Sequence, residues 1–127
     1  MKLQLISFGI KAIVEAVLPL PKADIYLDCR VIENPYHAKG IKASLGGDHP
    51  SLLAWTRAHN GNVIAQFLAL INFGLSNIPN RRRETPDPFA APVVIAFFCA
   101  YGVHRSVAMK HLMAEELTKQ GLDVEVL

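Results

Sequence analysis

The chain has 127 residues, 51% of them hydrophobic and 19% charged, with a formal net charge of +2. This composition excludes a disordered chain, and the length suits one domain that buries a core of its own. Two cysteines are too few for a disulfide framework or an all-cysteine zinc site. The simplest interpretation is one domain over residues 1–127 in the reducing cytoplasm, with no membrane or targeting segment.

The first quarter of the chain predicts two strands. Residues 2–8 combine alternation with β-branched and aromatic side chains, which favours a strand. Residues 12–20 fit a short helix or a loop equally well. Residues 25–31 predict a second strand, in which Asp28 and Arg30 alternate and therefore face the same side. There they would bind a ligand, orient another side chain or form a structural ion pair.

The middle of the chain predicts two helices. Adjacent glycines make residues 40–50 a loop. Residues 51–59 predict a short helix, with Asp48 or Ser51 as its cap. Apolar residues then recur with helical spacing over residues 63–75, which predicts a longer core helix.

The last third predicts a buried strand, a helix and a final strand. Residues 93–99 form a continuous apolar run, which is typical of a buried parallel strand. Residues 105–120 predict a helix that Gly121 ends, and residues 123–127 predict a short strand. The order of elements indicates an α/β fold: a mostly parallel, Rossmann-like sheet of about four strands, flanked by helices.

The segment between the buried strand and the last helix, residues 99–106, is the strongest candidate site. Ligands of open α/β sheets bind at the carboxyl ends of strands, and a helix N-terminus attracts anions. Gly102 permits a tight loop, and the planar fork of Arg105 suits phosphate or carboxylate. These features predict an anion site. The alternative is a structural turn in which Arg105 pairs with a carboxylate such as Asp28.

The same segment resembles the phosphate loop of cysteine-dependent phosphatases. Cys99 is followed after five residues by Arg105 and then Ser106. In such an enzyme Cys99 would be the nucleophilic thiolate, and Asp28 or Asp48 the general acid. The alternative role of Cys99 is that of a small buried hydrophobic residue.

Basic and aromatic residues outside this segment give weaker signals. The three arginines at 81–83 lie in a proline-rich loop, where they form either a solvated surface or an RNA-contacting patch. Trp55 is expected in the core or an interface. The histidines show no helical pairing typical of a metal site, so no metal or cofactor is expected.

Several segments, taken in order, resemble the C-terminal domain of the RNase adapter protein RapZ family. Residues 7–11 are similar to that domain's opening Ser-Phe-Gly-Phe-Lys. Residues 24–28 with Arg30 resemble its Asp-x-Arg strand, and residues 34–36 follow at the family's distance. The remaining matches lie in two loops, at Gly46, Asp48, Cys99, Gly102, His104, Arg105, Ser106 and Val107. The order holds from about residue 2 to residue 126.

The resemblance implies a non-catalytic module that binds structured, small regulatory RNA and self-associates. It also implies binding of a phosphosugar such as glucosamine-6-phosphate, and presentation of RNA to an endoribonuclease. The expected anion site comprises Cys99, Ala100, Tyr101, Gly102, His104, Arg105, Ser106, Arg30, Asn34 and Tyr36. The expected RNA contacts are Arg81, Arg82, Arg83 and Lys11.

The chain also departs from the family pattern. Ala100-Tyr101 replaces the family's Thr-Gly, and extra residues lie between Lys11 and Ala23. The sequence lacks the phosphate-binding Gly-x-x-x-x-Gly-Lys-Ser/Thr motif of the N-terminal domain in full-length members. It also stops at Leu127, before the family's basic tail. We therefore expect a stand-alone domain with weaker RNA binding than the family.

Overall fold

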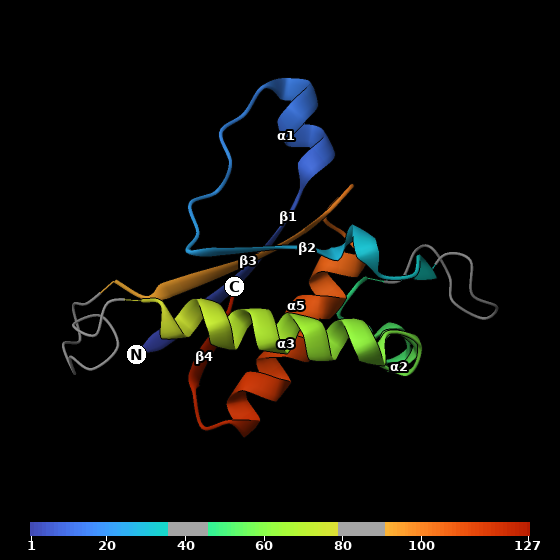
Figure 1. Ribbon diagram of the computed structural model, residues 1–127. Helices are drawn as coiled ribbons and strands as arrows, with labels where there is room; N and C mark the ends of the chain where they lie inside the picture. Colours follow the sequence, from blue (N-terminus) through green and yellow to red (C-terminus); the bar gives the residue numbers. More distant parts are fainter. Residues whose placement is uncertain (36–45, 79–90) are drawn as a thin grey trace.

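A four-stranded parallel sheet forms the centre of the computed structural model, which describes residues 1–35, 46–78 and 91–127 (Figure 1). The strands lie in the order β2-β3-β1-β4, and all neighbouring pairs are parallel. Their bounds are β1 Lys2–Gly9, β2 Ile25–Asp28, β3 Val93–Cys99 and β4 Asp123–Val126. The predicted α/β class with about four strands is confirmed.

Parallel pairing brings three strand ends to one edge of the sheet. The register places Gly9 of β1 beside Cys99 of β3, and Asp28 of β2 beside Phe98. The segments that follow these strands therefore start next to one another, although they are far apart in the sequence. This edge is where the sequence predicts an anion site.

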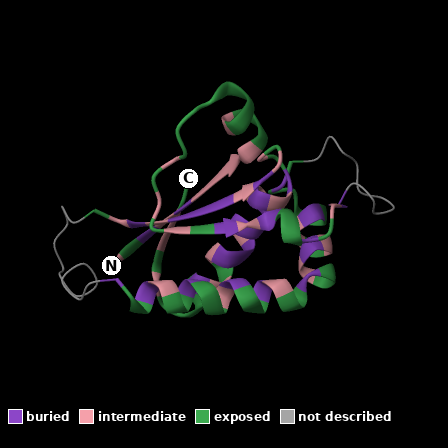
Figure 2. Cartoon of the chain, turned by 45° about the horizontal axis from the view of Figure 1, so that its top comes forward, coloured by how far each residue is buried: buried purple, intermediate pink, exposed green. Residues whose placement is uncertain are grey.

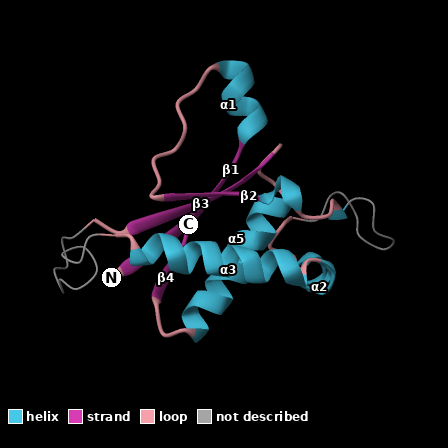
Figure 3. Cartoon of the chain, viewed as in Figure 1, coloured by secondary structure: helices cyan, strands magenta, loops and turns pink. Residues whose placement is uncertain are grey.

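Three helices cover one face of the sheet (Figure 3). Helix α5 (Arg105–Lys119) packs on β1, β3 and β4, while α2 (Pro50–His59) and α3 (Gly61–Ser76) pack on α5. Arg57 joins α2 to α5 through ion pairs with Glu115 at 2.6 Å and Glu116 at 3.0 Å. Helix α1 (Ile10–Ala16) has no buried residue and projects from the end of β1.

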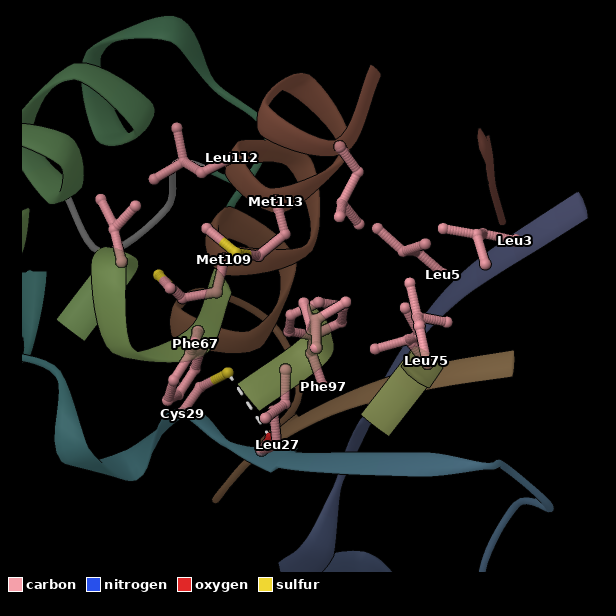
Figure 4. Packing of buried hydrophobic residues seen from close by; sticks show 14 of the residues in the cluster. Leu3, Leu5, Leu27, Cys29, Phe67, Leu75, Phe97, Met109, Leu112 and Met113 are labelled. Atoms are coloured by element: carbon pink, nitrogen blue, oxygen red, sulfur yellow. Dashed lines mark hydrogen bonds between the residues drawn. The ribbon is translucent and has the colours of Figure 1, made fainter. Parts of the chain in front are cut away.

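The core lies between the sheet and these helices (Figures 2 and 4). Alternate residues of β1 and β3 face it because successive strand side chains point to opposite faces. Leu3, Leu5, Ile95 and Phe97 are fully buried there. Helix α5 supplies the opposing layer: Met109, Leu112, Met113 and Leu117.

The opposite face of the sheet carries a small aromatic cluster. The rings of Phe8 and Phe98 stack at 5.5 Å, and Tyr26 meets Phe8 edge-on at 6.5 Å. The guanidinium of Arg30 lies 5.6 Å from the centre of the Phe98 ring. The cluster thus reaches from the sheet to the edge where the strands end.

The predicted strand over residues 25–31 is wrong beyond Asp28. Cys29–Val31 form a 3-10 turn (η1), because the Asp28 carboxylate accepts a hydrogen bond from the Arg30 backbone N–H at 2.9 Å. Arg30 therefore leaves the strand, and the argument from alternation fails. The anticipated ion pair is nevertheless present, with Arg30 Nη2 2.7 Å from Asp28 Oδ2.

Other element predictions need smaller corrections. Of the two structures considered for residues 12–20, a helix forms, over Ile10–Ala16. Helix α2 is capped by neither Asp48 nor Ser51: His49 Nδ1 accepts a hydrogen bond from the Ser51 N–H at 3.1 Å. Trp55 is half-buried and stacks on His59 at 4.5 Å.

Truncating a buried aromatic residue tests this packing. We expect Phe97→Ala to lower the free energy of unfolding by about 3–5 kcal/mol, because it opens a cavity in the core. Phe73→Ala is the matched control, since Phe73 is 70% exposed on α3; its effect should stay within about 0.5 kcal/mol. Urea denaturation measures both. Equal losses in the two variants would contradict this core.

Candidate anion-binding site

The loop between β3 and α5 is held by direct backbone contact with β1. Gly102 has a φ of +74°, and a Cβ added there would lie 2.4 Å from the Gly9 nitrogen. A Cβ on Gly9 would lie 2.5 Å from the carbonyl carbon of Tyr101. The Lys11 N–H donates to the Ala100 carbonyl at 3.0 Å. No side chain fits between the two segments, so both glycines are structural requirements of the site.

Cys99 ends β3 and lies inside this loop. Its Sγ accepts a hydrogen bond from the Gly102 N–H at 3.2 Å and is hydrogen-bonded to Ser106 Oγ at 3.2 Å. Burial raises the pKa of the thiol. The Ser106 hydroxyl, the N–H groups of Ser106 and Gly102 and the charge of Arg105 outweigh that effect and hold the pKa below its usual range. The loop is therefore built to stabilise negative charge.

Arg105 is the first residue of α5 and reaches towards the end of β2. Its Nη1 donates to the Arg30 carbonyl at 3.3 Å, the one hydrogen bond of this guanidinium within the described parts of the chain. Most of its five N–H donors are thus available to a ligand.

Asp28 is engaged by Arg30 instead of Arg105. Arg30 Nε and Nη2 bind the two carboxylate oxygens at 2.9 and 2.7 Å. This bidentate contact lowers the pKa of the Asp28 carboxyl, although partial burial opposes the shift, and the charge of Arg105 adds to the lowering. The structural-turn alternative, with Arg105 paired to Asp28, is therefore not the arrangement found.

A small cavity opens at the start of α5. It measures about 130 Å³ and is lined by Asn34, Cys99, Tyr101, Val103, His104 and Arg105. This is well above the ~10–15 Å³ that one water needs, so the cavity has room for a group larger than a single water molecule. Five of these six lining residues are among the expected site residues.

The remaining expected residues surround the cavity or lie elsewhere. Ser106 is fully buried behind Cys99. Lys11 forms an outer rim, with Nζ 3.1 Å from Tyr101 Oη, and the ring of Tyr101 is 70% exposed. Tyr36 and the three arginines at 81–83 lie outside the described residues.

Residue-by-residue inspection of the sequence missed two contributors. A Cβ on Gly47 would lie 2.6 Å from the His104 carbonyl oxygen, and the Gly47 N–H donates to Val103 at 3.1 Å. The adjacent glycines predict a loop, and Gly46 is also one of the matches to the family, but neither feature places Gly47 against the start of α5. Cys29 is the second such residue. It directly follows β2, and Cys99 is the last residue of the neighbouring strand β3.

The described segments also carry two negative findings. Among them, no cluster of three or more His, Cys, Asp or Glu side chains could hold a metal ion. No helix in those segments has the length and apolar character needed to cross a membrane.

A matched pair of glycine substitutions tests the backbone contact. Gly102 and Gly121 both have positive φ, but a Cβ on Gly121 would meet nothing within 4 Å. We expect Gly121→Ala to cost roughly 1–2 kcal/mol, the strain of the left-handed conformation. Gly102→Ala should cost clearly more, since it adds a backbone clash. Equal losses in thermal or urea unfolding would show that the close approach is not needed.

The hydrogen bond from Ser106 gives a pH prediction. A lowered pKa keeps the Cys99 thiolate populated at pH values where an ordinary thiol, with a pKa of ~8.5, is protonated. Ser106→Ala should move the pH profile of iodoacetamide alkylation upwards, measured with Cys29→Ser in the background. Ser76→Ala, on the exposed surface of α3, should leave the profile unchanged. An unmoved profile in Ser106→Ala would contradict the role of this hydroxyl.

Comparison with known proteins adds a family match to this geometry. The RapZ C-terminal domain family matches residues 1–127. A nucleotide-binding protein of Desulforamulus reducens is 31% identical over 122 residues, which are 95% of this chain and 37% of that protein. One of Caldicellulosiruptor bescii is 32% identical over 130 residues, with 99% and 40% covered. The chain thus spans well under half the length of these curated relatives.

Proposed function

The chain belongs to the RapZ C-terminal domain family, and on that premise we propose that it is a non-catalytic anion-binding module. Its first ligand is the phosphate backbone of structured RNA, and its second is a phosphorylated small molecule such as glucosamine-6-phosphate. The observation that carries the proposal is the Arg105 guanidinium beside the cavity at the N-terminus of α5.

The electrostatics of the site support an anion. Helix α5 has 15 residues, so its first turn presents N–H groups and a partial positive charge to the cavity. Arg105 adds a full charge with available donors. Arg30 forms an ion pair with Asp28 at the end of the neighbouring strand. Lys11 adds a positive charge at the outer rim of the cavity, and its Nζ lies 4.0 Å from Glu15 Oε1. With the Cys99 thiol protonated, these side chains leave a positive balance at the cavity.

The relatives fit this chemistry in general terms. They are named nucleotide-binding proteins, and nucleotides share the phosphate group with RNA and phosphosugars. Self-association and contact with an endoribonuclease, which the resemblance implies, are further parts of the proposal.

The site favours binding over hydrolysis. A cysteine-dependent phosphatase needs a protonated acid near the leaving group. The bidentate contact with Arg30 keeps Asp28 ionised, with its pKa below the usual range, so this carboxyl has no proton to give near neutral pH. Cys99 accordingly lines the cavity without acting as a nucleophile towards phosphate.

Titration of a labelled RNA hairpin tests the proposal. We expect Arg105→Ala to weaken binding roughly ten- to a hundredfold, the loss of a hydrogen-bonded charge pair. It should also reduce the salt dependence by about one phosphate contact. Lys119→Ala removes the same charge from the opposite end of α5 and serves as the control. Fluorescence anisotropy at two salt concentrations measures both variants.

Two results would contradict the proposal in different ways. Absence of RNA binding at low salt would remove RNA as the main ligand. Titration with glucosamine-6-phosphate would then test the phosphosugar alone, with glucosamine, which lacks the phosphate, as the control. Equal weakening by Arg105→Ala and Lys119→Ala would show a general charge effect and no site at the loop.

A further inference from the structure

The two cysteines of the chain lie side by side at the ends of neighbouring strands. In the register of β2 and β3, Leu27 pairs with Phe97 and Asp28 pairs with Phe98. The residues that follow Asp28 and Phe98 in the sequence are both cysteines. Up to the pair of Asp28 and Phe98 the two strands lie about 4.8 Å apart, a spacing comparable to the ~4.4–6.8 Å separation of Cα atoms in disulfides. Cys29, the first residue of η1, lies one residue beyond it.

Both thiols face the same side of the sheet. Cys29 and Cys99 are 0% and 3% exposed and belong to one buried cluster. Figure 4 shows Cys29 among the buried side chains, where its thiol donates a hydrogen bond to the Leu27 carbonyl at 3.7 Å. Burial raises the pKa of Cys29, and the negative charge of Cys99 adds to this effect.

The surroundings of the two thiols are opposite in character. Cys99 lines the cavity at the start of α5 and is hydrogen-bonded to Ser106 and Gly102, which favour its thiolate. Cys29 is fully buried, and burial together with the neighbouring Cys99 raises the pKa of its thiol far above the usual range. The Cys99 sulfur therefore borders the cavity in surroundings that favour its thiolate, whereas the Cys29 sulfur is protonated and further from solvent.

We propose that Cys99 and Cys29 form a redox pair, in which a hydroperoxide entering the cavity oxidises Cys99 and Cys29 then closes an intramolecular disulfide. In the first step the Cys99 thiolate attacks the terminal oxygen of the peroxide. The O–O bond breaks, the sulfur becomes a sulfenic acid and the leaving oxygen takes a proton as an alcohol or water. In the second step Cys29 sulfur attacks the sulfenic sulfur, and the hydroxyl leaves with the Cys29 proton as water. Two thiols lose two electrons in total, and the peroxide gains them.

Disulfide formation would reach the anion site through η1 and the loop. It takes the thiolate away from the Gly102 and Ser106 donors. It also ties Cys29 to β3, and Cys29 begins the turn whose Arg30 carbonyl holds Arg105. Because the disulfide removes the negative charge of the Cys99 thiolate and frees the Gly102 and Ser106 donors, we expect the oxidised chain to bind inorganic phosphate more tightly than the reduced chain at a pH where the thiolate is populated. This consequence rests on the proposed function, whereas the disulfide itself does not.

Peptide mapping by mass spectrometry tests the pair directly. Wild type, Cys29→Ser and Cys99→Ser are treated with a small excess of hydrogen peroxide, and free thiols are then blocked. Wild type should lose the mass of two hydrogens and yield a disulfide-linked pair of peptides that contain Cys29 and Cys99. Reduction should restore the original mass and the two separate peptides. Cys29→Ser should accumulate a dimedone-reactive sulfenic acid at Cys99. Cys99→Ser should stay unmodified, because Cys29 is shielded.

The inference would be overturned by three results. One is oxidation of Cys99 in wild type to sulfinic acid without a link to Cys29. Another is a disulfide between two chains, visible as a dimer on a non-reducing gel. The third is oxidation of Cys29 in Cys99→Ser at the wild-type rate. Since wild type carries the main readout, a folding defect in a variant cannot decide the outcome. Phosphate binding by oxidised wild type is then measured separately, so failure of the anion site leaves the disulfide result intact.

Discussion

The site depends on one close contact, the backbone of β1 at Gly9 against the backbone of the β3–α5 loop at Gly102. A Cβ on either residue would come within 2.4 to 2.5 Å of the facing backbone. Because the two segments touch without side chains between them, the loop turns tightly enough for the Gly102 N–H to reach the Cys99 sulfur. The same turn starts α5 at Arg105 and points its N-terminus towards the ends of β1, β2 and β3.

The distribution of charge at this edge depends on the early end of β2. The 3-10 turn brings the Arg30 side chain back onto Asp28 in a bidentate contact. It also turns the Arg30 carbonyl towards Arg105, so that guanidinium donates to a neutral acceptor. Local backbone chemistry at Asp28 therefore accompanies the choice of Arg30, and not Arg105, as the bidentate partner of this carboxylate.

The sequence predicts the sheet and the loop well because both have local signals. Residues 93–99 are apolar throughout, and the spacing of Cys99, Gly102 and Arg105 marks the strand–helix turn. It does not predict where β2 ends, since Asp28 can cap a turn or extend a strand, and tertiary context decides. The adjacency of Cys29 and Cys99 is equally hidden, because it follows from the parallel register between β2 and β3. The helix cap at His49 was missed because imidazole is an uncommon cap.

The two proposals for this edge constrain each other through shared donors. The Gly102 N–H and the Ser106 hydroxyl, which stabilise the Cys99 thiolate, stand at the same helix N-terminus that would receive a phosphate. A bound anion and a thiolate carry charges of the same sign, so anion binding raises the pKa of Cys99. By linkage, ionisation of Cys99 weakens anion binding by the same factor. A chain with an occupied site is therefore the less reactive towards peroxide, and the empty site is the one in which Cys99 is exposed to oxidation.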